Sequence, residues 1–283
     1  MSRELLASIL LIVALVLLLV IARKLTPSRA PPDVGEGLEL EPVDKVRLVV
    51  VVDNNPGGPG LEPAWGISVY VDTGSAKILF DTGPDPRVLE RNARTLGVDL
   101  SSLNAVVISH GHGDHVGGLP AVAEASPGVT VYIPRGSGLK AGVRSLGLNP
   151  VEVSEPTVLF KGVAVTGPLY GPPVEQSLIV YVRGRGLVVV TGCSHPGVDR
   201  IVEFAHNVTG LPVYAVLGGF HLGGASRSRL EEIASVFERL GLKEVYPLHC
   251  TGSEARKYFE VRLGQVYRDG HVGITVEIAA PDA

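Results

Sequence analysis

The sequence is poor in aromatic residues, cysteine and excess charge. Phe, Trp and Tyr make up 5% of its 283 residues, so a folded core has to be built from aliphatic side chains. The two cysteines, Cys193 and Cys250, cannot form a disulfide framework, and they lack the close spacing of a zinc knuckle. The formal net charge is −4, whereas a nucleic-acid-binding domain needs a basic face to neutralise phosphates. We therefore expect a folded protein without a nucleic-acid partner.

A long apolar run stands near the N-terminus. The residues from Leu5 to Ala22 are uncharged and almost wholly aliphatic, and a helix of this length rises about 27 Å, close to the hydrocarbon thickness of a bilayer. The run lacks the small-residue cleavage pattern of a secretory signal, which favours a retained membrane anchor over residues 1–25 to a cleaved signal peptide. Arg23, Lys24 and Arg29 follow the run, so the positive-inside rule predicts that the remainder faces the cytoplasm.

The segment after this run predicts a linker. Residues 26–44 contain four prolines and no apolar periodicity, which is typical of a semi-rigid tether. The first continuous β-branched run begins at Lys45. We therefore expect one globular domain over residues 45–283.

Short aliphatic runs and helix signals alternate within this domain. The early part is rich in short strands, whereas the last third alternates strands with helices. Such an order predicts two sheets packed face to face with helices outside. Strands are expected over 45–53, 67–72, 76–81, 105–109, 129–133, 151–153, 157–160, 163–166, 177–182, 187–191, 213–217, 244–248 and 273–278, and helices over 86–96, 138–146, 198–208, 226–240 and 253–263.

A dense group of metal donors follows the strand expected over 105–109. His110, His112, Asp114 and His115 lie within six residues and are separated by glycines. Imidazole and carboxylate groups are ligands that Zn²⁺ and similar cations prefer. In an extended stretch His110 and His112 point the same way and can hold one ion, whereas Asp114 and His115 can turn toward a second position. The spacing therefore predicts a site for one or two divalent metal ions.

The pattern HxHxDH after a strand resembles the metallo-β-lactamase superfamily, and residues 78–83 (ILFDTG) resemble its upstream strand signature. Three further segments narrow the resemblance: 191–195 (TGCSH), 218–222 (GGFHL) and 248–252 (LHCTG). Together they resemble the family of 7,8-dihydropterin-6-methyl-4-(β-D-ribofuranosyl)-aminobenzene 5′-phosphate synthases. The resemblance extends from about Lys45 to the C-terminus, and the N-terminal apolar run is not part of the family pattern.

The superfamily resemblance implies an αββα sandwich with metals at one edge of the sheets. It implies that His110 and His112 bind the first metal, and that Asp114 and His115 bind the second. The remaining implied residues are His249 as the last histidine ligand, His195 as a further ligand, His221 at the same edge, Asp81 as a residue that orients a ligand, and Asp114, His195 and His221 as catalytic residues. Cys193 is a candidate ligand, and Glu175 and Cys250 are further candidates, whereas His206 and His271 are expected to be ordinary surface histidines.

The sequence departs from the superfamily at two ligand positions. His195 and Cys193 stand where most members have a metal-bridging aspartate, and residues 163–176 contain no histidine for the third motif. A bridging carboxylate neutralises two adjacent dications, so its loss favours a single ion or a looser pair. Histidine donors favour Zn²⁺, whereas Mg²⁺ and Mn²⁺ prefer more oxygen ligands, and the choice between them stays open.

The resemblance implies a transferase that acts on small phosphorylated molecules. In that reaction an aminobenzene ribotide displaces diphosphate from a dihydropterin-methyl diphosphate. Backbone N–H groups near 191–194 and 251–252, each before an expected helix, can meet phosphate oxygens. Two alternatives remain: a metal-dependent hydrolase of a phosphodiester, lactone or thioester, and a non-catalytic metal-dependent sensor domain. The sequence thus favours a membrane-anchored, cytoplasmic metalloenzyme.

Overall fold

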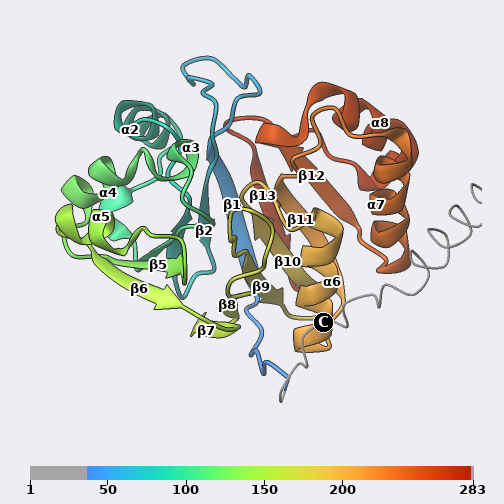
Figure 1. The fold of residues 1–283 in the computed structure, drawn as a ribbon, viewed down its shortest axis with the longest axis horizontal. Coiled ribbons are helices and arrows are strands. Elements are labelled where there is room, and N and C mark those ends of the chain that lie inside the picture. Colours follow the sequence, from blue (N-terminus) through green and yellow to red (C-terminus); the bar gives the residue numbers. More distant parts are fainter. Residues whose placement is uncertain (1–36, 282–283) are drawn as a thin grey trace, which may run out of the picture. The chain divides into compact units, whose positions relative to one another are not determined.

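The computed structural model describes residues 37–281. The predicted anchor and most of the predicted linker lie outside these residues. Within 37–281, no helix is long and apolar enough to cross a membrane. The described part contains two β-sheets, with helices on both sides (Figure 1).

The first sheet has seven strands in the order β13-β1-β2-β3-β4-β5-β6. The strands β13, β1, β2 and β3 pair antiparallel, whereas β3, β4, β5 and β6 are parallel. Their bounds are β1 Lys45–Val52, β2 Ser68–Asp72, β3 Lys77–Phe80, β4 Ala105–Val107, β5 Thr130–Pro134, β6 Asn149–Val153 and β13 Thr275–Ala279.

The second sheet has six strands in the order β12-β11-β10-β9-β8-β7. Here β10, β11 and β12 are parallel, and the others pair antiparallel. Their bounds are β7 Thr157–Phe160, β8 Val163–Val165, β9 Leu178–Val182, β10 Gly186–Thr191, β11 Val213–Gly219 and β12 Glu244–Leu248.

The two sheets bury one aliphatic core between them and one further core on each outer face. In β1, Leu48 and Val50 point into the central core, whereas Val49 and Val51 pack under the helices of the first sheet. This alternation is the period of a strand, and it explains why a run of valines is buried on both faces. The expected αββα sandwich is therefore confirmed.

The outer helices belong to two groups, which flank the sheets in Figure 1. The helices α2 Pro86–Thr95, α3 Gly113–Val116, α4 Leu119–Ala125 and α5 Lys140–Ser145 follow strands of the first sheet, and α6 Val198–Thr209, α7 Arg227–Arg239 and α8 Ser253–Leu263 follow strands of the second. The start of α2 agrees with the sequence prediction, because the Asp85 side chain accepts hydrogen bonds from the backbone N–H groups of Arg87 and Val88. The helix α4 was not among the expected elements.

The globular unit begins earlier than the predicted boundary at Lys45. Leu40 and Val43 are buried, and the backbone N–H of Leu38 donates to the carbonyl of Val208. Val43 also forms a bridge with Val182 beside the second sheet. The last part of the predicted linker is therefore packed on the domain, because isolated apolar residues can be buried without a periodic pattern that reveals them.

The strand ends position the functional residues. In a parallel arrangement the carboxyl ends of neighbouring strands meet at one edge of a sheet. Asp81 follows β3, the histidine-rich loop follows β4, and His195, His221 and His249 follow β10, β11 and β12. Segments far apart in the sequence thus converge at one edge of the sandwich.

Candidate metal centre

Three histidine side chains form a first group. His110 Nε2 lies 3.0 Å from His112 Nδ1, and the ring centroids of His110 and His195 are 4.7 Å apart. One ligand atom from each of these residues lies within 4.8 Å of the other two. Two unprotonated ring nitrogens at hydrogen-bond distance repel each other unless a proton or a cation lies between them. This group is suited to hold one metal ion.

A second group lies beside the first. Asp114 Oδ2 is 3.2 Å from His249 Nε2 and 3.8 Å from His115 Nε2, and the three ligand atoms lie within 4.8 Å of one another. His115 and His249 are almost completely buried. The aspartate carboxylate and two imidazoles make a mixed oxygen and nitrogen donor set, which suits Zn²⁺.

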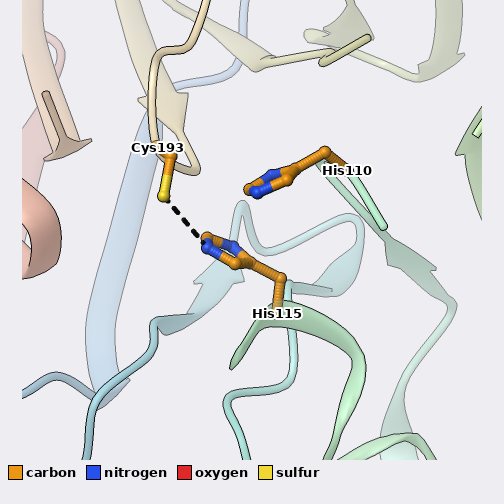
Figure 2. A group of neighbouring side chains, drawn as sticks. All are labelled: His110, His115 and Cys193. Carbon is orange, nitrogen blue, oxygen red and sulfur yellow. Dashed lines mark hydrogen bonds between the residues drawn. The ribbon is translucent and has the colours of Figure 1, made fainter. Parts of the chain in front are cut away.

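Cys193 connects the two groups. Its Sγ lies 3.2 Å from His115 Nε2, and it also belongs to a cluster with His110 in which the three ligand atoms lie within 4.8 Å of one another. Figure 2 shows both imidazoles pointing toward the sulfur. Contact with the Cys250 thiol and burial raise the pKa of the Cys193 thiol, so a nearby cation is needed to hold it as a thiolate. Cys193 is thus a candidate ligand shared by both groups.

The histidines are oriented through the nitrogen that faces away from the groups. The Nδ1 atoms of His115 and His195 lie 2.7 Å from Asp81 Oδ2 and 3.0 Å from Glu175 Oε2. A carboxylate accepts only, so each Nδ1 donates to its carboxylate and each Nε2 is the nitrogen directed toward the donor groups. His249 Nε2 is buried, is not aligned for a hydrogen bond with Asp114, and has no other hydrogen-bond partner. A buried ring nitrogen without a partner, beside others directed to the same place, fits a bound cation.

Asp81 is hydrogen-bonded to a donor residue and belongs to neither donor group, the place that the resemblance implied for it. Besides His115, its carboxylate accepts hydrogen bonds from the Ser109 backbone N–H at 2.7 Å and from the Ser109 hydroxyl at 2.6 Å. The Ser109 hydroxyl oxygen in turn lies 2.9 Å from His110 Nδ1. One buried carboxylate therefore fixes ring orientations in both groups.

Glu175 holds the loop after β10. Its carboxylate accepts hydrogen bonds from the backbone N–H groups of Cys193, Ser194 and His195, at 3.0, 2.8 and 2.8 Å. Burial alone would raise the pKa of Glu175, but these bonds and the nearby histidines lower it to about 2. The loop that carries two candidate ligands is thus built around one buried anion.

Asp53 and Asn54, which follow β1, were not among the residues expected at the site. Asn54 Oδ1 lies 2.9 Å from His249 Nδ1, and Asp53 Oδ1 accepts a hydrogen bond of 2.6 Å from the His249 backbone N–H. Asp53 ends the strand run expected at 45–53, and Asn54 follows it directly. The predicted site residues are polar residues directly after a buried strand. Asp53 and Asn54 fit the same pattern, so the sequence contained a signal for them as well.

Backbone strain is concentrated at this edge. Within residues 37–281, the non-glycine residues with positive φ are Asp81, Ser194, His221 and His249. Each such conformation costs of order 1–3 kcal/mol and persists where surrounding contacts enforce it. All four follow strands that end at the metal centre. Placing these side chains therefore lowers the free energy of unfolding.

Two of the histidines are held in the state that binds a cation. Burial, followed by the neighbouring His115, lowers the pKa of His110 to about 2, and burial and His195 lower the pKa of His112. Burial would raise the pKa of Asp114, but contact with His249 and His115 outweighs it and holds the pKa well below its usual range. At neutral pH the His110 and His112 imidazoles are therefore neutral and the Asp114 carboxylate is ionised, as metal binding requires.

The structure brings the predicted residues together, with one difference in grouping. His195 joins His110 and His112, and thereby supplies the third histidine that the sequence lacks in 163–176. Cys193, and not His195, lies between the two groups. His221 stacks on His195 at a centroid distance of 4.6 Å and forms a cluster with Cys193 and Cys250. Chain order alone could not show which of 193 and 195 turns toward which group.

Comparisons with known proteins agree with this geometry. Residues 66–211, more than half of the chain, match the family model of the metallo-beta-lactamase superfamily. The chain is 26% identical to 7,8-dihydropterin-6-methyl-4-(beta-D-ribofuranosyl)-aminobenzene-5'-phosphate synthase of Methanocaldococcus jannaschii, over 82% of this chain and 96% of that protein.

Solved structures show the same fold. Tm1679, described as a metal-dependent hydrolase of the beta-lactamase superfamily, is 30% identical with a TM-score of 0.73, over 83% of this chain and 99% of that one. The metallo-beta-lactamase fold protein YhfI from Bacillus subtilis is 17% identical with a TM-score of 0.62, over 83% of this chain and 100% of that one. The chain belongs to the metallo-beta-lactamase superfamily.

Proposed function

We propose that this protein is a metal-dependent transferase that joins a dihydropterin-methyl diphosphate to an aminobenzene ribotide and releases diphosphate. The match to the synthase of M. jannaschii, which extends over nearly all of that protein, supports this reaction. The observation that carries the proposal is a cationic cavity directly beside the candidate metal centre. A transferase of this kind needs both, because its leaving group is a polyanion.

The donor set described above fits divalent metal. His110, His112 and His195 would hold one ion, Asp114, His115 and His249 a second, and Cys193 would be shared. When bound, such ions supply Lewis-acid stabilisation of negative charge on a leaving oxygen. The thiol and imidazole donors favour Zn²⁺ over Mg²⁺ or Mn²⁺.

The cavity has a volume of about 460 Å³, and its lining includes His221 and the donor His195. Arg200 and Arg229 line it as well, and α6 begins there. The Arg229 guanidinium is also ion-paired with Asp199, at 2.5 Å. Contact with the Cys250 thiol raises the pKa of His221, which favours its cationic form. Positive charge and a helix N-terminus favour bound phosphate groups.

The proposed step forms one bond and breaks one. The arylamine nitrogen attacks the methylene carbon of the pterin, and the bond between this carbon and the diphosphate oxygen breaks. The departing diphosphate is a stronger base than an arylamine, so it takes up the amine proton. His221 and Arg200 would bind the diphosphate, and His195, which lines the same cavity and stacks on His221, would hold the metal ion next to this anion.

The test is turnover by the purified full chain after loading with Zn²⁺, Mn²⁺ or Mg²⁺. Both substrates are supplied, and the products are followed by mass spectrometry and by diphosphate release. We expect equal amounts of coupled product and diphosphate. Diphosphate release without coupling, or no release with any metal, would contradict the proposal.

A hydrolase is the second candidate, because His195 completes a group of three histidines and because Tm1679 is described as a hydrolase. The same preparation can be assayed with phosphodiester, lactone and thioester substrates. Turnover of one of these in the absence of an amine acceptor would favour the hydrolase. Metal binding without turnover of any substrate would favour a sensor domain.

A further inference from the structure

Two aromatic side chains are exposed although aromatic residues are scarce in this chain. Trp65 is 62% exposed and Tyr170 is 77% exposed. The other large apolar side chains that are exposed within residues 37–281 are aliphatic. An exposed indole buries little apolar surface in the folded chain, so packing in the core does not explain why a tryptophan stands at this position.

Trp65 is fixed against the second donor group. Its ring centroid lies 4.9 Å from that of His249. The next residue, Gly66, packs so tightly on the backbone of Asp114 that a Cβ there would lie 2.4 Å from the Asp114 carbonyl oxygen. The backbone N–H of Ile67 donates to the same oxygen. The indole thus lies against His249 while Trp65 remains 62% exposed to solvent.

Tyr170 belongs to a loop that packs on the first donor group. Leu169 and Glu175 exchange two backbone hydrogen bonds of 2.8 and 3.1 Å, which close this loop above the carboxylate that holds His195. A Cβ on Gly171 would lie 2.4 Å from the His195 carbonyl carbon, so the backbone of Gly171 is pressed against the loop after β10. Tyr170 is therefore placed next to this contact.

We infer that Trp65 is a stacking platform for a planar heteroaromatic ring of the substrate, and that Tyr170 supports the same ligand from the side of the first donor group. Indole offers a large apolar face for offset stacking, and its orientation is set by only two torsions. The platform lies next to the donors, so a ring bound there would place a substituent at the metal centre. This inference deepens the proposed function, because it assigns the pterin ring of the proposed substrate to Trp65.

Tryptophan fluorescence of the unlabelled protein can detect this contact, because Trp65 is the single tryptophan of the chain. The full chain is titrated with 6-hydroxymethylpterin, which has the ring but no leaving group and cannot react. We expect saturable quenching of tryptophan emission. Inorganic diphosphate, the matched probe without a ring, should bind without comparable quenching. Equal quenching by diphosphate, or no change with the pterin, would overturn the inference.

Substitutions then separate stacking from folding. Calorimetric titration should show binding of 6-hydroxymethylpterin weakened about 10- to 100-fold in Trp65→Ala, less in Trp65→Phe and moderately in Tyr170→Ala. Val261→Ala, which changes an apolar side chain that is 80% exposed on α8, should bind like the wild type. Metal content should stay unchanged in all four variants. Wild-type affinity in Trp65→Ala would refute the stacking role.

The outcome is independent of the reaction. Pterin binding that depends on Trp65, without any coupling activity, would support the stacking role of Trp65 and contradict the proposed transferase reaction. Coupling with an unchanged KM for the pterin substrate in Trp65→Ala would support the transferase reaction and contradict the stacking role of Trp65. If the transferase and the platform are both correct, the substitution raises this KM about 10- to 100-fold and changes kcat little.

Discussion

Replacing Cys193 with serine tests whether the sulfur between the two donor groups is a metal ligand. Sγ lies 3.2 Å from His115 Nε2, and it shares a cluster with His110. Serine has nearly the same shape, so the loop held by Glu175 should keep its conformation. The substitution therefore changes the donor atom and little else.

The size of the effect follows from the number of donors. A structural zinc site with four ligands binds with about 10–16 kcal/mol, so one ligand contributes roughly 3 kcal/mol, or about 100-fold in affinity. A serine hydroxyl is a harder donor than a thiolate and favours Mg²⁺ or Mn²⁺ relative to Zn²⁺. We expect Cys193→Ser to bind Zn²⁺ about 100-fold more weakly, with a smaller change for Mn²⁺.

The assay uses Co²⁺ as a spectroscopic substitute for Zn²⁺. A cobalt ion bound by thiolate shows sulfur-to-metal charge-transfer absorption, and chelator competition gives the affinity for Zn²⁺. The wild type should show the charge-transfer band, and Cys193→Ser should lose it. Cys250→Ser is the matched control, because Cys250 is buried beside Cys193 but shares no donor cluster with His110 or His115. A band that survives in Cys193→Ser, or that is lost in the control, would refute the reasoning.

Three further predictions concern the donors, acid stability and the domain boundary. His110→Ala and His112→Ala should each lose one bound metal ion by elemental analysis, and His206→Ala should lose none; equal loss in the control would show that the donors are wrongly assigned. The pKa of His110 is about 2 in the folded chain and rises to 6.5 on unfolding, so unfolding takes up a proton below pH 6.5. Urea unfolding of the metal-free protein should therefore lose about 1.4 kcal/mol per pH unit between pH 6 and 4, and this component should vanish in His110→Ala. A chain that begins at Gly37 should fold, whereas one that begins at Asp44 loses two buried aliphatic side chains and should be roughly 3–6 kcal/mol less stable by the same assay.

The arrangement of the sheets could be predicted from the sequence because it depends on local patterns. Runs such as 45–52 are buried on both faces, and Asp85 with Pro86 marks a helix start. Each such element can therefore be recognised from a few neighbouring residues. The short helix α4 was missed because a seven-residue helix after a glycine pair gives little periodicity. The packed end of the predicted linker was missed for a similar reason.

The site could be predicted in its composition but not in its connections. The HxHxDH pattern places four donors within six residues, whereas His195 and His249 reach them only through the three-dimensional path of the chain. Which of Cys193 and His195 faces which donor group depends on the turn around Glu175. The pairing of Asn54 with His249 joins positions 195 residues apart, and no local pattern predicts such a pairing.

That pairing has a consequence for the order of events during synthesis. Asp53 and Asn54 are synthesised well before His249 and the strand β13, which pairs with β1. Contacts of such sequence separation form late, because the intervening chain must first be confined. A nascent chain can therefore display the HxHxDH loop long before the second donor group is complete. A chain that stops before His249 therefore carries the HxHxDH loop but only part of the second donor group.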